Sequence, residues 1–269
     1  MIRVAGLNHA IGRTQILRNV DVKIPQGKVT ALIGPNGAGK STLLSLMARL
    51  QKLQSGTITV DGLNVSTCPS TELAKHLAIL PQSADIALRL SVEELVAFGR
   101  FPHSHGHLGQ EDHRAVEEAM EIFGLQPLRN RLLESLSGGQ RQKALLAMIF
   151  AQDTRYLLLD EPLNNLDIAG ARSLMSDLLT ATRQRGRTTV IVLHDIAYAL
   201  AYADHVVLLS QGHIVGEGPP QETLTEARIA EIYGTRIRLH QIDGRTLLDV
   251  GPNKSPDFGS FGKSTQAVT

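Results

Sequence analysis

Alternating apolar and polar positions predict β-structure in the first sixty residues. Val20, Val22 and Ile24 are separated by polar residues, a period of two that indicates a strand with one buried face. Residues 29–33 form a nearly continuous apolar run, which is typical of a strand buried on both faces. Residues 57–60 alternate again and end at Asp61-Gly62, a hairpin turn signal. The chain is therefore expected to begin with strands.

From residue 91 to about residue 152 the apolar positions recur with a helical period. Ser91 and Glu94 have the spacing of a capping box at a helix N-terminus. Val116, Ala119 and Met120 lie on one face of a helix predicted over residues 111–123. We expect a mostly helical insert of roughly 60 residues.

Strand-like runs return at residues 156–159 and 188–193, with a helix predicted over residues 169–184 between them. Short strands and helices follow the turn at residues 211–212 and continue to about residue 250. This alternation predicts an α/β fold in a single domain, residues 1–250. Residues 251–269 are rich in Gly, Ser, Pro and polar side chains, and we expect them to be disordered.

Composition and charge limit the partners that the chain can recognise. The net charge is +1, so there is no global basic field to attract nucleic acid or anionic lipid. Aromatic residues make up only 4%, which argues against a base-stacking surface. Cys68 is the only cysteine, which excludes an intrachain disulfide and fits a reducing compartment. No signal-peptide pattern and no apolar run of about 20 residues is present, so a membrane role would require docking onto other subunits.

A glycine-rich segment after the predicted buried strand matches the pattern G-x-x-x-x-G-K-[ST]. Glycines allow successive N–H groups to face one anion, and the N-terminus of the next helix adds partial positive charge. Lys40 would bind the β- and γ-phosphates, and the Ser41 hydroxyl would be a ligand of Mg²⁺. The alternative is a glycine-rich turn that matches by chance, and the flanking strand and helix argue against it. The predicted nucleotide ligands are Gly34, Pro35, Asn36, Gly37, Ala38, Gly39, Lys40, Ser41 and Thr42.

Two adjacent carboxylates end the apolar strand at residues 156–159. Asp160 suits a Mg²⁺ ligand at a strand end, and Glu161 lies one residue further, where it could accept a proton from an attacking water. Such pairs are common at strand ends, so the pair becomes persuasive only because a phosphate loop precedes it in the same chain.

A second candidate anion site opens the helix predicted over residues 140–151. Its residues are Ser137, Gly138, Gly139 and Gln140. One chain would then have two anion-binding helix N-termini but only one nucleotide. A head-to-tail dimer would use both, because the second N-terminus of each copy would cover the γ-phosphate held by the other copy. The alternative interpretation is an ordinary helix whose N-terminus is capped by Ser137.

The order of these segments resembles the ATP-binding cassette (ABC) ATPases over roughly residues 1–225. The resemblance implies a P-loop NTPase core of RecA type (residues 1–90 and 153–250), an N-terminal antiparallel β-subdomain and an inserted α-helical subdomain (about residues 91–152). It also implies Mg²⁺-dependent hydrolysis of ATP, with Lys40 and Glu161 as catalytic residues. Gln82 is similar to the glutamine that contacts Mg²⁺ and the attacking water, and His194 to the histidine that binds the γ-phosphate. Asp167 is similar to an aspartate at the dimer seam.

Two positions depart from the family pattern. The residue expected to stack on adenine is usually aromatic, but here Ile11 occupies it and offers only an apolar contact, so GTP could be tolerated. The segment at residues 163–167 contains Asn164 and Asn165, where many relatives have Ser followed by Ala or Gly.

Four histidines at positions 103, 105, 107 and 113 could suggest a metal site. No carboxylate or cysteine framework accompanies them, so a solvated loop is the preferred interpretation.

The short insert and the segment at residues 95–102 resemble the ATPases of iron-siderophore, haem and vitamin B12 importers. The resemblance implies a second copy of the chain, two transmembrane permeases and, indirectly, a solute-binding protein, with no nucleic acid. It places the chain peripherally on the cytoplasmic face of the inner membrane. An iron(III)-siderophore is the favoured cargo, and haem or cobalamin are alternatives. A soluble ABC ATPase in iron–sulfur assembly, translation or repair is the alternative from another class, and a non-hydrolysing cassette is disfavoured by Glu161 and His194.

Overall fold

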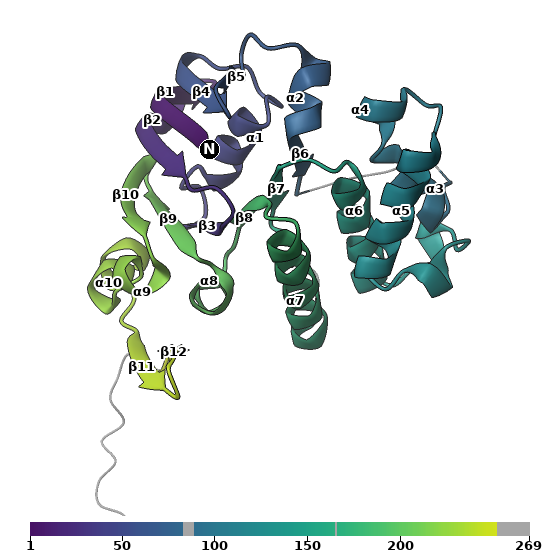
Figure 1. The fold of residues 1–269 in the computed structure, drawn as a ribbon. Coiled ribbons are helices and arrows are strands. Elements are labelled where there is room, and N and C mark those ends of the chain that lie inside the picture. Colours follow the sequence, from purple (N-terminus) through teal and green to yellow (C-terminus); the bar gives the residue numbers. More distant parts are fainter. Residues whose placement is uncertain (83–88, 165, 252–269) are drawn as a thin grey trace, which may run out of the picture.

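The computed structural model describes residues 1–82, 89–164 and 166–251. The predicted disordered tail therefore lies outside the described residues, apart from Gly251. The described part combines an antiparallel sheet at the N-terminus, a mainly parallel sheet and a group of helices beside it (Figure 1). This confirms the predicted α/β fold with an N-terminal antiparallel β-part and an inserted helical part.

The antiparallel sheet forms where the sequence alternates. Val20 pairs with Leu7 and Val22 with Val4, so the apolar side chains of neighbouring strands share the buried face. The turn at Asp61 and Gly62 joins the last two strands, as predicted from the hairpin signal. Within the described residues the strand order is β2-β1-β4-β5. The strands are β1 (Ile2–Ile11), β2 (Thr14–Ile24), β4 (Ser55–Val60) and β5 (Leu63–Asn64).

The second sheet is built from the nearly continuous apolar runs. Its described strands lie in the order β10-β9-β3-β8-β7-β6, and all are parallel except β10, which forms a hairpin with β9. The carboxyl ends of β3, β7 and β8 are therefore neighbours at one edge of the sheet, where α/β folds bind their ligands. The strands are β3 (Val29–Ile33), β6 (Leu77–Leu80), β7 (Tyr156–Asp160), β8 (Thr188–Val192), β9 (His205–Ser210) and β10 (His213–Gly218).

Alternate residues of these buried strands supply two hydrophobic cores. Leu32 and Leu158 point to the face that packs against helix α1 (Lys40–Met47) and the antiparallel sheet. Ala31 and Leu157 point to the opposite face, which the remaining large helices cover. A strand buried on both faces has no polar face to present, which explains the continuous apolar runs. Helix α1 ends at Met47, shortly before Arg49, which adopts a left-handed conformation with φ of 57° that does not continue a right-handed helix.

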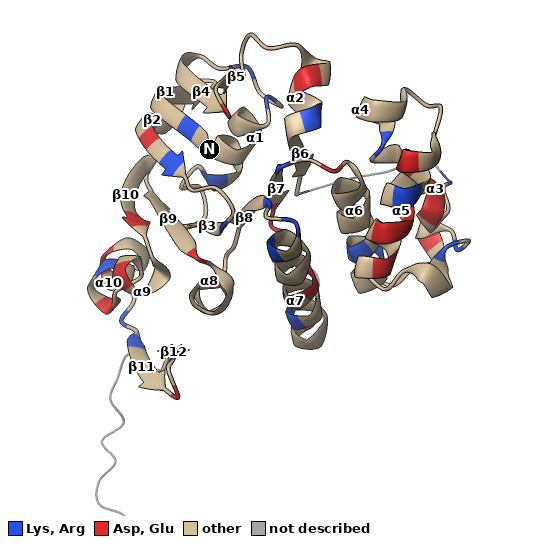
Figure 2. Cartoon of the chain, viewed as in Figure 1, with Lys and Arg blue, Asp and Glu red and all other residues tan. Residues whose placement is uncertain are grey.

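The other helices and two short hairpin strands complete the described part. Lys143 on α6 pairs with Asp177 on α7 at 2.7 Å, which links the helical region (α3 to α6) to the rest of the chain. Residues of both charges lie in this helical region, with acidic side chains on α3 and α5 and basic side chains on α6 (Figure 2). The remaining elements are α2 (Ser70–His76), α3 (Val92–Phe98), α4 (Phe101–Ser104), α5 (Gln110–Ile122), α6 (Gly138–Ala151), α7 (Ile168–Gln184), α8 (Ile196–Tyr202), α9 (Pro220–Thr223), α10 (Glu226–Tyr233), β11 (Arg238–Ile242) and β12 (Arg245–Asp249), with 3₁₀ turns at Gln126–Leu128 and Leu133–Ser135.

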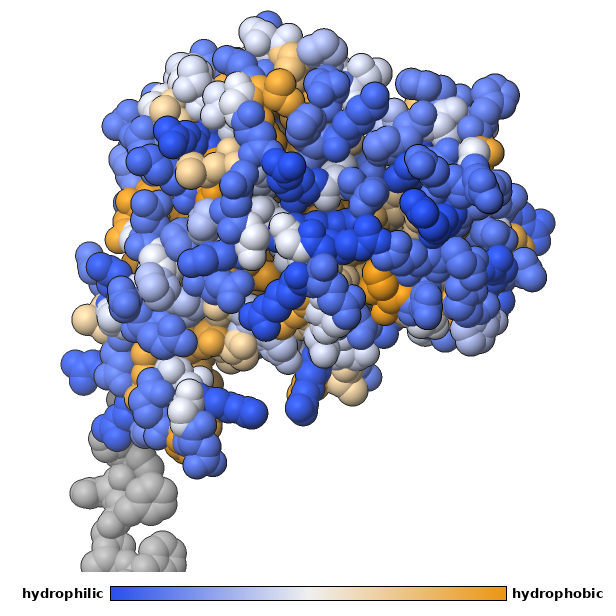
Figure 3. All heavy atoms as spheres, in the orientation of Figure 1, coloured by the Kyte–Doolittle hydropathy of each residue, from blue (hydrophilic) through white to orange (hydrophobic). Residues whose placement is uncertain are grey.

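The surface agrees with the balanced composition. Hydrophilic residues dominate the face in Figure 3, and apolar groups form scattered patches. None of the helices in the described ranges is long and apolar enough to cross a bilayer. The short helix α4 occupies part of the segment interpreted as a solvated histidine loop, and His103 there lies 2.9 Å from the carbonyl oxygen of Gln152.

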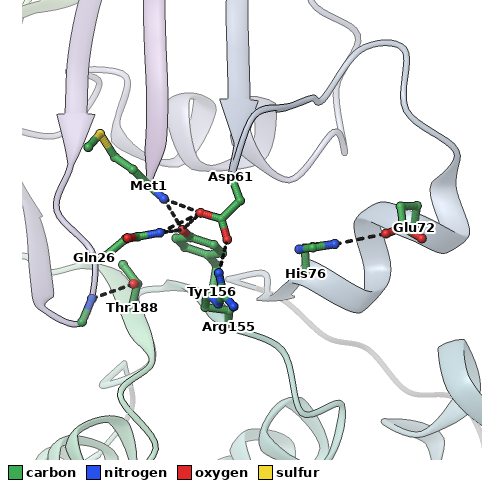
Figure 4. A network of polar contacts seen from close by, with 9 residues as sticks. Met1, Gln26, Asp61, Glu72, His76, Arg155, Tyr156 and Thr188 are labelled. Atoms are coloured by element: carbon green, nitrogen blue, oxygen red, sulfur yellow. Dashed lines mark hydrogen bonds and ion pairs between the residues drawn. The ribbon is translucent and has the colours of Figure 1, made fainter.

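A polar network joins the two sheets at the amino end of β7 (Figure 4). The Tyr156 hydroxyl donates to Asp61 in the turn between β4 and β5, and Arg155 donates to the other oxygen of that carboxylate at 2.7 Å. The Met1 ammonium and the Gln26 amide donate to the first oxygen at 2.5 and 2.7 Å. The two sheets are thereby fixed at the end of β7 that lies opposite the phosphate loop.

Candidate active site

The phosphate loop begins where β3 ends, and its backbone requires glycine at two positions. Gly34 has φ of 154°, and a Cβ atom there would lie 2.1 Å from the Leu209 carbonyl oxygen on β9. Gly39 has φ of 102°, and a Cβ atom there would lie 2.7 Å from Leu17. Both positions combine an unfavourable backbone conformation with a clash, so the loop can follow this path only with glycine.

Lys40 begins α1 and turns its side chain back into the loop. The residue is 5% exposed, and its ammonium donates to the carbonyl oxygens of Gly34 and Pro35 at 2.7 and 3.0 Å. Burial lowers the pKa of Lys40, and the carboxylates of Glu161 and Asp160 offset only part of that effect. The site therefore holds a desolvated cation that an anionic ligand would stabilise.

Ser41 and Asp160 meet across the gap between α1 and the end of β7. The Ser41 hydroxyl donates to Asp160 Oδ1 at 2.8 Å. Burial raises the pKa of Asp160, the Ser41 hydrogen bond opposes that rise, and neighbouring Glu161 adds to it. A hydroxyl and a carboxylate oxygen side by side, with the carboxylate lacking full charge compensation, are suitable ligands for Mg²⁺. The residues present thus fit a divalent cation.

Glu161 follows β7 in a tight turn and carries the most crowded carboxylate of the site. Its φ is 50°, a left-handed conformation that a non-glycine residue adopts at a cost of about 1–3 kcal/mol. The side chain is 7% exposed. Gln82 and Asn164 both donate to Oε2 at 2.6 Å, and His194 Nε2 lies 2.5 Å from Oε1.

These contacts bring together residues from three adjacent strands of the parallel sheet. Gln82 follows β6, Glu161 follows β7 and His194 follows β8. Together with the phosphate loop they line a cavity of about 680 Å³. Gln82, predicted as a Mg²⁺ ligand, contacts Glu161 in this structure, while Ser41 and Asp160 form a separate pair.

The remaining predicted residues lie apart from this cavity. Ser137 caps α6 by accepting from the Gln140 N–H at 3.3 Å, and the Gln140 side chain accepts from the Ser137 N–H at 3.1 Å. Asp167 caps α7 by accepting from the Gly170 N–H at 2.7 Å. Ile11, at the end of β1, is 54% exposed. Among the described residues, the lining of the 680 Å³ cavity includes none of Ile11, Asp167 or residues 137–140.

Two residues of the site were not predicted from the sequence. Tyr233, the last residue of α10, lines the cavity next to the phosphate loop. Its hydroxyl is buried, and no group in the described part of the chain meets hydrogen-bond geometry with it. Burial raises the pKa of Tyr233 to about 12, and the nearby Gly34 backbone opposes that rise. Asn164 was noted only as a departure from the family pattern. Tyr233 belongs to no motif, so only the folded chain identifies it.

The arrangement has the components of phosphoryl transfer from a nucleotide to water. A loop of N–H groups and a buried ammonium can hold the phosphates, and a buried carboxylate can accept a proton from water. An imidazole and an amide lie within hydrogen-bond reach of that carboxylate. No group of three or more His, Cys, Asp or Glu side chains that could hold a metal ion occurs in the described ranges.

Comparison with known proteins identifies the family. The ABC transporter family model matches residues 17–164. The petrobactin import ATP-binding protein YclP of Bacillus subtilis (strain 168) is 44% identical, over 92% of this chain and 98% of its own length. The ferric enterobactin transport ATP-binding protein FepC of Escherichia coli (strain K12) is 40% identical, over 88% of this chain and 89% of its own length.

A solved structure supports the same fold. An inward-facing conformation of a putative metal-chelate type ABC transporter superposes with a TM-score of 0.79 at 24% identity, covering 92% of this chain and 95% of that one. The family match spans the phosphate loop and the carboxylate pair, where the structure gathers the groups for phosphoryl transfer. The chain therefore belongs to the ABC transporter family and is one of its ATP-binding, ATP-hydrolysing subunits.

Proposed function

We propose that this chain drives the import of an iron(III)-siderophore through partner permeases. The observation that carries the proposal is the similarity, at 40–44% identity and over most of each chain, to relatives named for petrobactin import and ferric enterobactin transport. Cargo is recognised by other subunits, so the contribution of this chain is the coupled hydrolysis of ATP.

In the proposed reaction, Glu161 is the general base. A water oxygen attacks the γ-phosphorus while Glu161 takes a proton from that water. The bond between the γ-phosphorus and the bridging oxygen breaks, and ADP leaves with the electron pair, so the products are ADP and inorganic phosphate. The Lys40 ammonium and the loop N–H groups (residues 34–42) hold the phosphates, and His194 donates to the γ-phosphate. Glu161, His194 and residues 34–37 line one cavity, and the Lys40 ammonium is bonded to the carbonyl oxygens of Gly34 and Pro35, which supports these roles.

Mg²⁺ is the proposed metal cofactor. The Ser41 hydroxyl and the Asp160 carboxylate would hold it, with Gln82 as a third ligand, since Ser41 and Asp160 are already 2.8 Å apart. When bound, the ion would neutralise charge on the phosphate oxygens. Gln82 would have to leave Glu161 to reach the ion.

A second copy of the chain is proposed to complete the site. Ser137, Gly138, Gly139 and Gln140 form a capped helix N-terminus that is not occupied by the chain's own phosphate loop, which supports a role toward the nucleotide of a partner copy. Asp167 would lie at the seam between the copies. Ile11 is exposed at the end of β1 and is proposed to contact the adenine base.

The proposed assembly places the dimer on two permeases at the cytoplasmic face of the membrane, with a solute-binding protein on the other side. We propose that the chain is divided into a RecA-type core (residues 1–90 and 153–250) and a helical subdomain (about residues 91–152), and that the permeases dock near their boundary beside Gln82. The ion pair of Lys143 with Asp177 would then be one of the contacts across this boundary.

Uptake measurements in the host test the proposed cargo. The gene is deleted and complemented with the wild type or with the Glu161→Gln variant, and uptake of ⁵⁵Fe-loaded catecholate siderophore, labelled haem and labelled cobalamin is followed. We expect a loss of siderophore uptake that only the wild type restores. Loss of haem or cobalamin uptake alone would assign those cargoes instead, and unchanged uptake of all three would favour a soluble ABC ATPase.

A further inference from the structure

Both oxygens of the Glu161 carboxylate are occupied in the structure. His194 is at Oε1, and Gln82 and Asn164 donate to Oε2. A general base needs a free lone pair that faces the attacking water. Three of the roughly four lone-pair sites of the carboxylate are therefore taken, and with the side chain only 7% exposed the attacking water gains full access to Oε1 only when His194 leaves.

The three donors differ in whether they can leave. Gln82 and His194 come from the ends of β6 and β8, and the proposed function gives each of them a ligand of its own: Mg²⁺ for Gln82 and the γ-phosphate for His194. Asn164 lies in the same turn as Glu161. Its backbone N–H donates to the Glu161 carbonyl oxygen at 3.2 Å while its side-chain amide donates to Oε2 at 2.6 Å.

The two bonds make Asn164 move with the carboxylate. The turn also holds Glu161 in a left-handed conformation, and its side chain lines the cavity. When nucleotide draws His194 and Gln82 away, Oε2 would still be held by Asn164, and Oε1 would be released.

We propose that Asn164 is a positioning residue that keeps Oε2 of Glu161 occupied, so that Oε1 is the oxygen that takes the proton from water. This inference rests on the proposed function of Glu161 as the base. A carboxylate held by one oxygen presents a single orientation to the water, and such orientation contributes to the rate without contributing to nucleotide affinity.

The test compares three substitutions in the full-length chain by steady-state ATPase kinetics. Asn164→Ala removes the amide, and Asn164→Asp keeps its size but replaces the donor with an acceptor that repels Glu161. Asn64, whose side-chain oxygen accepts from the Ser66 N–H at 2.9 Å in a distant turn, provides the matched control as Asn64→Ala. We expect kcat to fall about tenfold for Asn164→Ala and further for Asn164→Asp, with KM for ATP within about twofold and Asn64→Ala unchanged.

A double-mutant cycle separates positioning from structural support. In the Glu161→Gln background, Asn164→Ala should cause no further fall in rate, because the carboxylate that it positions is gone. An equal further fall would overturn the inference, as would a wild-type kcat in Asn164→Ala and Asn164→Asp. If Glu161→Gln itself keeps full activity, the proposed function of Glu161 fails, which is a different result from a failure of Asn164 alone. Melting temperature and ADP affinity, measured on every variant, identify any substitution that acts through misfolding.

Discussion

The two ends of β7 carry polar networks of opposite character. At the amino end, Asp61 and Tyr156 are each stabilised in the protonation state they have at neutral pH. Burial acts to raise the pKa of Asp61, but the Met1 ammonium, Tyr156 and Arg155 hold it at about 2. Burial and the Asp61 carboxylate raise the pKa of Tyr156 to about 12. This network is complete without any ligand.

At the carboxyl end the pKa shifts have the opposite sign. Burial lowers the pKa of Lys40 and raises the pKa of Asp160, so each group is destabilised in its charged form. The opposite signs of the pKa shifts distinguish a structural network from a site suited to binding charged ligands. The network at the amino end stabilises the folded chain. The charged groups at the carboxyl end are destabilising by themselves, and bound nucleotide and cation would offset that cost.

The largest effect is expected from Glu161→Gln, because it removes the proposed base. The rate of hydrolysis should fall at least about 100-fold, while ATP is retained and a closed dimer accumulates. Steady-state kinetics and size-exclusion chromatography with ATP check both parts. The melting temperature should not fall, because one of two adjacent buried carboxylates is lost. Undiminished hydrolysis would remove Glu161 from this role.

Lys40→Met is expected to weaken nucleotide binding next most strongly. The variant keeps most of the side-chain volume but loses the only buried ammonium that the described residues place in the loop. The dissociation constant for ATP, measured by isothermal titration calorimetry, should rise about tenfold or more. Lys143→Met serves as the control, because it removes an ammonium that is paired with Asp177 outside the cavity. Equal losses in both variants would contradict a specific role for Lys40.

The sequence was sufficient to predict which residues lie together at the carboxyl end of β7. The loop pattern specified residues 34–42, the apolar strand that ends in two carboxylates predicted Asp160 and Glu161, and the resemblance to the ABC ATPases predicted His194. The structure brings these residues together because parallel strands end at the same edge of a sheet, while their roles in catalysis stay predictions.

The other features of the two networks depend on contacts that no local sequence pattern specifies. Asp61 was predicted as a turn residue, but its partner Tyr156 is 95 residues away. The contact of Asn164 with Glu161 requires the left-handed turn at Glu161, and β-propensity or periodicity does not encode such a turn. Tyr233, at the end of α10, lines the cavity beside the phosphate loop only because the fold brings these distant segments of the chain together.

Asp61→Asn tests the structural end of the strand. The loss of charge-assisted hydrogen bonds should lower the free energy of unfolding by about 1–3 kcal/mol in urea titrations, with kcat unchanged. The folded-state pKa of about 2 lies below the usual value of 3.8, so the stabilisation is complete above about pH 5. The difference between wild type and variant should therefore shrink as the pH falls from about 5 toward 2.

The control for this experiment is Glu72→Gln, because Glu72 forms an exposed pair with His76 at 3.1 Å. That variant should lose about 0.5 kcal/mol or less. A fall in kcat for Asp61→Asn, or an equal loss of stability in both variants, would show that the two ends of β7 are not separate in function.

The smallest effect is expected from Tyr233→Phe, and its sign is the informative part. A buried hydroxyl without a partner costs free energy, so its removal should raise the free energy of unfolding of the nucleotide-free chain by about 0.5–1 kcal/mol. If the hydroxyl supports the Gly34 backbone once nucleotide is bound, KM for ATP should rise about two- to fivefold in the same variant. Because the pKa of Tyr233 is about 12, both effects should be constant between pH 6 and pH 9.

A variant that is less stable than the wild type would place Tyr233 with the structural network instead. If Tyr233→Phe raises the free energy of unfolding and also weakens ATP binding, the Tyr233 hydroxyl destabilises the free chain but contributes to its function.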